Sequence, residues 1–160
     1  MREAIGGTWI FTIVIVFIVL FSSYLAISVN YSKAFKVKNG IIDAIDRCNG
    51  YPEDGAIDNP NHCAVKAIED YLLQIGYHVY GNCAASNASD KDKLIETPSK
   101  KGASWYCIER ISTEGTQLPK VYYKVTVFFK LDLPIIGDIF TFPIYGDTKT
   151  IYSPNEKYEH

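Results

Sequence analysis

Cysteine is the residue type whose spacing in this sequence makes the most specific chemical prediction. Four cysteines occur, separated by 14, 19 and 23 intervening residues: Cys48, Cys63, Cys83 and Cys107. The lack of any Cys-x-x-Cys pair argues against a zinc site or a thioredoxin-type redox site. Four widely spaced cysteines in a small domain are instead typical of two disulfides, and three connectivities are open to them.

We favour the pairs Cys48–Cys63 and Cys83–Cys107, because each would close a segment that has little means of ordering itself. The first segment is rich in Gly, Pro, Asn and Asp, and the second begins with the polar run Ala84–Lys93. Closing loops of this length would stabilise the fold by about 3 kcal/mol each in the chain-entropy model. The alternative is a cytoplasmic domain with four reduced, buried thiols.

Other residues that could do chemistry are few and scattered. The histidines are His62, His78 and His160, and only His62 neighbours a cysteine. Carboxylate pairs such as Asp43 and Asp46 are expected to be solvated charges rather than catalytic groups. The sequence contains no nucleophile elbow, zinc-protease helix or phosphate-binding glycine loop. We therefore expect no enzyme activity, no metal site and no cofactor.

The elements that must position these residues begin with an N-terminal apolar segment. The chain has 160 residues, 48% of them hydrophobic and 21% charged, with a net charge of −2. Those averages are ordinary for a soluble domain, but no Asp, Glu, Lys, Arg or His lies between Ala4 and Ser32. The near-neutral charge argues against nucleic acid as a partner, because phosphate binding requires a basic excess.

The apolar residues are concentrated between Trp9 and Val29, which is long enough for a helix that crosses the hydrocarbon core of a bilayer. A cleaved secretory signal is the alternative, but the apolar core of a signal is usually only about 7–15 residues long. The segment also lacks a good small-residue cleavage site. We therefore expect a retained membrane helix, with the lipid bilayer as one partner.

The helix is expected to continue beyond the membrane as an amphipathic stalk. A mostly apolar stripe recurs there at helical spacing and consists of Tyr31, Phe35, Lys38, Ile42 and Ile45. Because no Pro interrupts residues 1–51, a single helix from about Ile5 to Arg47 would be roughly 60 Å long. Gly40 is a weak point in this helix, since glycine costs up to about 1 kcal/mol relative to alanine.

The orientation of this helix is contested within the sequence. Lys33, Lys36 and Lys38 follow the apolar segment closely, and the positive-inside rule would place them in the cytoplasm together with the C-terminal domain. The cysteines favour the opposite, oxidising side. Because long domains can translocate despite a local charge bias, we follow the cysteines. The prediction is a single-pass membrane protein with an extracytoplasmic C-terminal head.

We divide the chain into a transmembrane helix and stalk over residues 1–47 and a disulfide-bonded head over residues 48–160. In the head, a loop leads to a short second helix that starts at Asn59-Pro60 and ends at Gly76. About four strands are predicted after it: Tyr77–Tyr80, Trp105–Thr113, Val121–Leu131 and Thr141–Tyr152. This order predicts an α+β fold, in which helices pack on one face of a small antiparallel sheet.

The segment Leu131–Tyr145 is unusually apolar for a turn region that contains Pro and Gly. It either folds back onto the core or contacts a partner or lipid. Two tripeptides, Asn30–Ser32 and Asn87–Ser89, match the glycosylation sequon, a match that is frequent by chance.

The whole layout resembles a pilin or type IV pseudopilin, and more narrowly the TadE-like pilins of tight-adherence (Tad) systems in their divergent Gram-positive form. Four features carry the resemblance: Gly6-Gly7 before the apolar helix, an amphipathic stalk, a small cysteine-containing sheet domain, and the closing segment Val121–Thr150. The resemblance implies a structural or accessory subunit of a Tad-type pilus or a type II secretion-like apparatus. Its partners would be other pilin-like subunits or assembly-platform membrane proteins.

The resemblance also implies roles for particular residues. Family members are often cleaved after a glycine, which points to Gly6 or Gly7, and they usually carry a docking Glu at the fifth position after it, where this chain has Thr12. Subunit contacts would run along the aromatic residues of the membrane helix, which are Trp9, Phe11, Phe17, Phe21 and Tyr24. The alternative function is a membrane-anchored ectodomain that binds a ligand or regulates a neighbouring membrane protein without polymerising.

Overall fold

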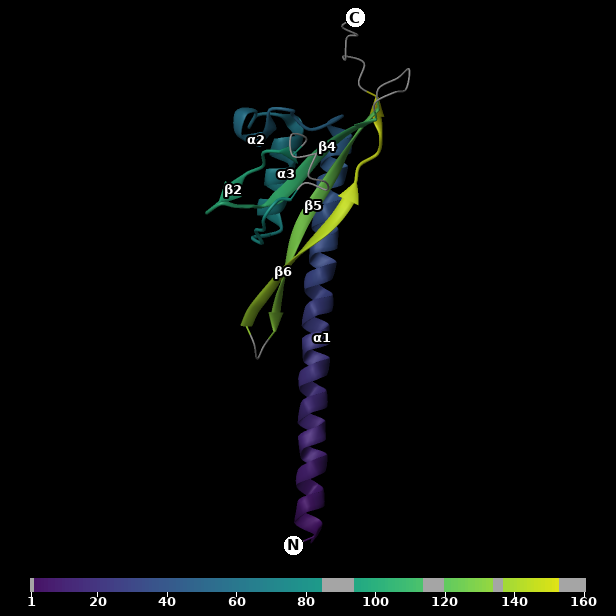
Figure 1. The fold of residues 1–160 in the computed structure, drawn as a ribbon, viewed down its shortest axis with the longest axis vertical. Coiled ribbons are helices and arrows are strands. Elements are labelled where there is room, and N and C mark those ends of the chain that lie inside the picture. Colours follow the sequence, from purple (N-terminus) through teal and green to yellow (C-terminus); the bar gives the residue numbers. More distant parts are fainter. Residues whose placement is uncertain (1, 85–93, 114–119, 134–136, 153–160) are drawn as a thin grey trace, which may run out of the picture.

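The computed structural model describes residues 2–84, 94–113, 120–133 and 137–152, and it shows one long helix that carries a small head (Figure 1). The helices are α1 (Arg2–Arg47), α2 (Gly55–Asp58) and α3 (Cys63–Gln74). The strands are β1 (Leu94–Ile95), β2 (Ser99–Lys100), β3 (Ala103–Ser104), β4 (Tyr106–Thr113), β5 (Lys120–Leu133), β6 (Gly137–Asp147) and β7 (Ile151–Tyr152). The fold is α+β, as predicted, with an antiparallel sheet packed on the long helix.

α1 is one unbroken helix from Arg2 to Arg47, close to the range predicted from the lack of proline. It ends where Asn49 adopts a left-handed conformation with a φ of 54° and Gly50 follows with a φ of 131°. The amide of Gly50 donates to the carbonyl of Ile45 at 3.0 Å, which caps the last turn. The helix therefore stops at the Asn-Gly breaker that the sequence contains.

The C-terminal half of α1 packs inside the head along a face that shares Ile42 and Ile45 with the predicted stripe and is centred to one side of it. Its buried apolar residues are Ala34, Val37, Ile41, Ala44 and Ile45. Of the expected stripe, Ile45 is buried and Ile42 is half-buried, whereas Tyr31 and Phe35 are 50% and 44% exposed. Tyr31 nevertheless packs edge-on against Phe129 of β5, whereas Phe35 lies at the surface. Small alanines on the buried face let the sheet and α3 approach the helix backbone.

α3 begins at Cys63, so the predicted start at Asn59-Pro60 was too early. His62 is the N-cap residue, and its Nδ1 accepts a hydrogen bond from the amide of Ala64 at 3.2 Å. The end of α3 lies where it was predicted, because Gly76 is left-handed with a φ of 63°. The amides of residues 76 and 77 donate back to the carbonyls of the last helical turn, as in a Schellman motif.

The main sheet is antiparallel with the strand order β1-β4-β5-β6, and β7 pairs with the first residues of β5. The two long central strands, β4 and β5, correspond to the predicted strands Trp105–Thr113 and Val121–Leu131. The predicted strand Tyr77–Tyr80 was wrong, because this segment is irregular and only the adjacent Gly81 forms an isolated bridge, with Ser104. β2 and β3 form a separate two-stranded hairpin.

The predicted last strand, Thr141–Tyr152, is divided into two strands. β6 ends at Asp147 and β7 begins at Ile151. Between them, the amide of Thr148 donates to the carbonyl of Tyr123 at 2.9 Å, and the hydroxyl of Thr148 accepts from the amide of Tyr123 at 2.9 Å. The Thr148 hydroxyl therefore takes the place of a backbone acceptor in the strand pairing with β5.

The core lies between the sheet and the two longer helices. Alternate residues of β5 point into it and are buried: Val121, Tyr123, Val125 and Val127. They belong to one cluster with Ile41 and Ile45 of α1 and with Ile68 and Leu72 of α3. The β5–β6 hairpin runs along α1 and extends toward its N-terminal half (Figure 1). The head is thus built around about the last four turns of the helix that carries it.

Candidate assembly surface

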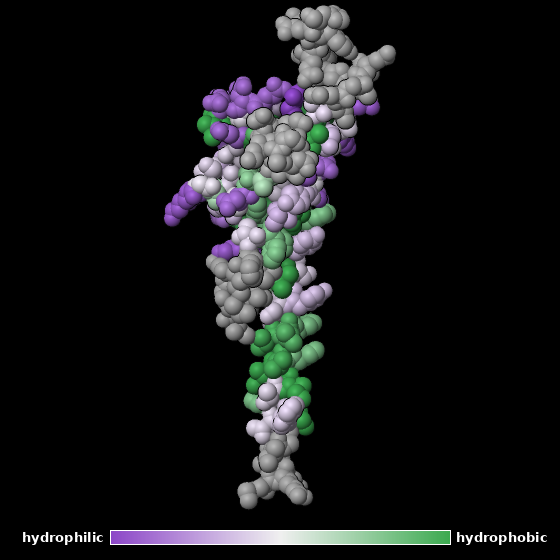
Figure 2. Space-filling view, in the orientation of Figure 1, coloured by the Kyte–Doolittle hydropathy of each residue, from purple (hydrophilic) through white to green (hydrophobic). Residues whose placement is uncertain are grey.

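The N-terminal half of α1 presents an extensive apolar surface. Trp9, Phe17 and Tyr24 are 70%, 67% and 67% exposed, respectively. Figure 2 shows hydrophobic surface, in green, along much of this half, and mostly hydrophilic or neutral surface on the head. Gly7–Arg47 is the one helix in the described part of the chain that is long and apolar enough to cross a membrane, judged by length and composition alone. A signal sequence would meet the same criterion.

The five aromatic residues predicted to make subunit contacts are all exposed, and most lie on one side of α1. At about 100° per residue, Trp9, Phe17, Phe21 and Tyr24 fall within an arc of roughly 120°, whereas Phe11 lies on the far side. The rings of Phe17 and Phe21 stack with their centroids 6.3 Å apart. The helix therefore has an aromatic side, which we define by Trp9, Phe17, Phe21 and Tyr24.

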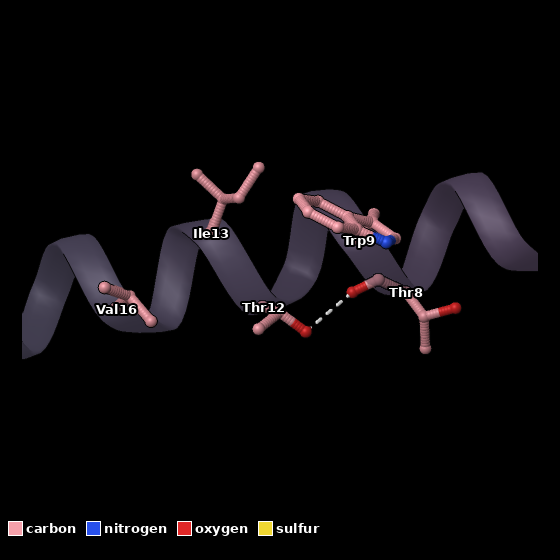
Figure 3. Close-up of a pocket in the computed structure, with 5 residues that line it drawn as sticks. All are labelled: Thr8, Trp9, Thr12, Ile13 and Val16. Atoms are coloured by element: carbon pink, nitrogen blue, oxygen red, sulfur yellow. Dashed lines mark hydrogen bonds between the residues drawn. The ribbon is translucent and has the colours of Figure 1, made fainter.

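A shallow hollow lies beside Trp9 (Figure 3). Its lining residues are Thr8, Trp9, Thr12, Ile13 and Val16. Its volume is about 340 Å³. Thr12 stands at the fifth position after Gly7, and its Oγ1 donates to the carbonyl of Thr8 at 2.9 Å. Because this hydroxyl is satisfied within its own helix, the hollow offers shape and apolar surface rather than charge.

Gly6 and Gly7 lie in the first two turns of α1, ahead of the hollow. A Cβ added at Gly7 would meet nothing within 4 Å, so the backbone there is open. Cleavage after either glycine would remove less than two turns of the helix. The aromatic side would remain intact.

A second group of aromatic residues lies where the β5–β6 hairpin meets α1. Tyr31 contacts Phe129 edge-on with 5.8 Å between ring centroids, and Phe129 stacks on Phe142 at 5.3 Å. Phe142 and Tyr145 on β6 are 41% and 54% exposed. Of the predicted segment Leu131–Tyr145, residues 131–140 lie outside the side chains that the structure describes. The described part, residues 141–145, lies mostly at the surface rather than in the core.

Both disulfides join the pairs expected from loop closure. Cys48–Cys63 links the end of α1 to the start of α3, and Cys83–Cys107 links the segment after α3 to β4. The Cα atoms are 5.7 Å apart in each pair. Two disulfides in a small head favour an oxidising, extracytoplasmic environment.

Three buried tyrosines fasten the head to the end of the stalk. The hydroxyls of Tyr51 and Tyr106 are hydrogen-bonded at 3.0 Å, and Tyr123 donates to the carbonyl of Tyr51 at 3.2 Å. Burial raises the pKa of Tyr51 from 10.0 to about 12, although the hydrogen bond with Tyr106 opposes this. Burial also raises the pKa of Tyr106 above its ordinary value. The hydroxyls of Tyr51 and Tyr106 are therefore neutral near pH 7, and all three tyrosines act as structural hydrogen-bonding groups.

The two histidines that the structure describes, His62 and His78, do not converge on a site. His62 caps α3, and His78, which was expected within a strand, is exposed and stacks on Trp105 with 6.2 Å between ring centroids. His160 and the sequon Asn87–Ser89 lie outside the described residues. Within the described ranges, no group of three or more His, Cys, Asp or Glu side chains is placed to hold a metal ion.

No family model, curated protein or solved structure matches the chain. Its architecture is nevertheless pilin-like, because a long N-terminal apolar helix is followed by a small antiparallel sheet packed on the C-terminal half of that helix. The geometry of α1 and of the head is therefore what points to a function.

Proposed function

We propose that this protein is a membrane-anchored, pilin-like structural or accessory subunit of a Tad-type pilus or a type II secretion-like assembly apparatus. The observation that carries the proposal is the division of α1, which is a core element of the head at one end and exposed apolar surface at the other. An apolar surface of this extent is not left in water by a soluble protein. Lipid or the helices of neighbouring subunits must cover it.

Both environments suit the apolar half of α1. The 22 residues from Thr8 to Val29 span about 33 Å at 1.5 Å per residue, which matches a hydrocarbon thickness of about 30 Å. In an assembly, packing between helices can replace lipid contacts, since lipid tails are as apolar as the side chains. The aromatic side offers large, rigid surfaces for that packing.

The head is proposed to lie outside the cytoplasm. The two disulfides support this orientation. Lys33, Lys36 and Lys38 do not prevent it, because a long domain can translocate against a local charge bias. Protease added to spheroplasts should therefore digest the head and leave the membrane-embedded part of α1 protected.

The proposed assembly is tested by photo-crosslinking of the full chain in its native cells. A photoreactive residue replaces Phe17, on the aromatic side, or Phe11, which is 65% exposed but on the far side and serves as the matched control. We expect the residue at position 17 to crosslink to a second copy or to another pilin-like subunit at least several-fold more than the residue at position 11. The crosslinks should disappear when the ATPase that would drive such an assembly apparatus is inactivated.

Crosslinks to no protein from either position, in a chain that is inserted in the membrane, would contradict assembly. That result would favour the anchored ectodomain, which does not polymerise. One observation speaks for this second function: Thr12 occupies the position of the docking Glu, and its hydroxyl is bonded to Thr8.

A further inference from the structure

A small recess opens at the end of the head that is nearest the apolar half of α1. Three segments line it: Asn30 and Lys33 from α1, residues 76–79 after α3, and Phe129 with Lys130 from β5. Its volume is about 290 Å³, which is large enough for a phosphate group and a few attached carbons. The recess is separate from the aromatic side of α1.

Hydrogen bonds within the head hold the segment after α3 that lines the recess. The carbonyl of Tyr77 accepts a hydrogen bond from Trp105 Nε1 at 2.7 Å, and the hydroxyl of Tyr77 donates to the carbonyl of Phe128. The last carbonyls of α3 accept from the amides of residues 76 and 77 at 3.1 and 3.0 Å. The Tyr77 carbonyl therefore already has a partner within the head.

The side chains at the recess supply positive charge and donors. Lys33 supplies an exposed ammonium group, and Asn30 adds a side-chain amide one turn before it. Lys130 of β5 also lines the recess but already has a partner of its own. The first acidic residue of α1 after this turn is Asp43, about 15 Å further along the helix. An anion with several acceptor oxygens is the ligand that this set of groups favours, and ammonium groups are common phosphate binders.

The position of the recess along α1, relative to the expected hydrocarbon layer, indicates which molecule would supply such an anion. If Thr8–Val29 fills the hydrocarbon, Asn30 and Lys33 lie about 1.5–6 Å beyond it, in the layer of the lipid phosphates. Tyr24 and Tyr31, which are 67% and 50% exposed, flank the end of the apolar segment. Tyrosines are enriched at this level in membrane proteins.

We propose that the recess binds the phosphate of an anionic lipid headgroup. Lys33 is the principal cation, and Phe129 lies beside the glycerol and the first acyl carbons. The inference rests on the part of the proposed function that places α1 across the bilayer. A lipid held between α1 and β5 would brace the head against the membrane surface.

The test measures lipid binding to the full chain in neutral detergent micelles. Trp9→Phe leaves Trp105, which stacks on His78 beside the recess, as the single tryptophan, and its fluorescence is followed. Short-chain phosphatidylglycerol, phosphatidylcholine and inorganic phosphate are titrated separately. We expect saturable binding of phosphatidylglycerol that is about fivefold weaker in Lys33→Gln and is restored in Lys33→Arg.

The matched control is Lys36→Gln, because Lys36 is an exposed lysine of the same helix outside the recess, and its binding should stay within about twofold of the parent. Equal binding of the two lipids, or equal losses in the two glutamine variants, would overturn the proposal. Saturable binding of inorganic phosphate that phosphatidylglycerol does not displace would overturn the lipid source.

Membrane insertion is scored separately by carbonate extraction of the same variants from liposomes. A chain that fails to insert contradicts both the proposed function and this inference. An inserted chain with no preference for phosphatidylglycerol contradicts only the inference, because α1 would still be available for assembly.

Discussion

Gly40 sets the closeness of the contact between α1 and α3. A Cβ at this position would lie 2.7 Å from the hydroxyl oxygen of Tyr71 and nearer still to its ring carbons. Tyr71 reaches across from α3 and donates that hydroxyl to the carbonyl of Lys36 at 3.2 Å. From sequence alone Gly40 is a weak point of a helix, because nothing local reveals the ring that occupies the space of its missing side chain.

Gly40→Ala should lower the free energy of unfolding by about 1–2 kcal/mol, since overpacking against Tyr71 outweighs a gain of about 1 kcal/mol in helix propensity. Urea unfolding of the full chain in micelles measures the change. In a Tyr71→Ala background the same substitution should be stabilising. A stabilising effect with Tyr71 present would mean that the ring does not hold this position.

The buried tyrosines predict a loss of stability at alkaline pH. Because the pKa of Tyr51 rises from 10.0 in the unfolded chain to about 12 in the folded one, the unfolded chain releases this proton first. The contribution of the neutral Tyr51 hydroxyl to the free energy of unfolding is complete below pH 10.0. It is lost as the pH rises to about 12, at up to about 1.4 kcal/mol per pH unit. Denaturant unfolding at several pH values measures the slope. Tyr51→Phe should make it shallower, and an unchanged slope would refute this cause.

At the scale of elements, the stalk half of α1 holds the head through its most buried face, and Phe35 lies outside that contact. Ile41 is fully buried, whereas Phe35 is 44% exposed and lies under the ammonium of Lys38. Ile41→Ala should therefore lower the free energy of unfolding by about 2–5 kcal/mol. The control Phe35→Ala should cost about 1 kcal/mol or less. Equal losses in urea unfolding would show that Phe35 also belongs to the face that holds the head.

The disulfides are expected to contribute in the order of the loops that they close. Cys48–Cys63 spans 15 residues of sequence and Cys83–Cys107 spans 24. Replacing either pair by alanine should cost about 3 kcal/mol, and the second pair about 0.4 kcal/mol more than the first in the chain-entropy model. Thermal unfolding of the two double variants without reductant gives the comparison. A variant as stable as the parent would show that its loop is ordered by other contacts.

Sequence patterns predicted the elements that depend on local rules. α1 followed from a long apolar stretch without proline, the end of α3 from Gly76, and the central strands from runs of β-branched and aromatic residues. Elements that depend on distant partners were not predictable. Tyr77–Tyr80 has strand-like residues, but the Tyr77 carbonyl is bonded to the indole of Trp105 instead of a strand. The last strand divides because Thr148 bonds to Tyr123.

The candidate surfaces likewise include features that can be predicted from local sequence and features that depend on distant segments coming together. The exposed aromatic residues of α1 and the cysteine pairs follow from composition and loop length, so they could be named from the sequence. The recess at Lys33 could not, because its walls come from three segments that are about 45–100 residues apart in the chain. The contact of Tyr31 with Phe129, and of Phe129 with Phe142, likewise depends on the register of β5 and β6, which the local sequence does not reveal.

At the scale of the whole molecule, assembly requires α1 to connect lipid and head without a break. Ser32 is exposed and lies at the junction of the two halves. Ser32→Pro removes a helical hydrogen bond and kinks the helix, at a cost of about 3 kcal/mol or more. We expect the variant to insert and to form both disulfides, while crosslinking from position 17 falls at least several-fold. Ser32→Ala is the control, and undiminished crosslinking in the proline variant would show that a straight helix is not needed.

The unbroken course of α1 has a mechanical consequence. Its two halves turn together as one lever, because no loop interrupts residues 2–47. From Asn30 to Arg47 the helix extends about 27 Å beyond the hydrocarbon, and a tilt of about 20°, which is ordinary for a membrane helix, would swing its far end sideways by about 9 Å. The lateral position of the head above the bilayer is then set by the angle at which the helix sits in lipid.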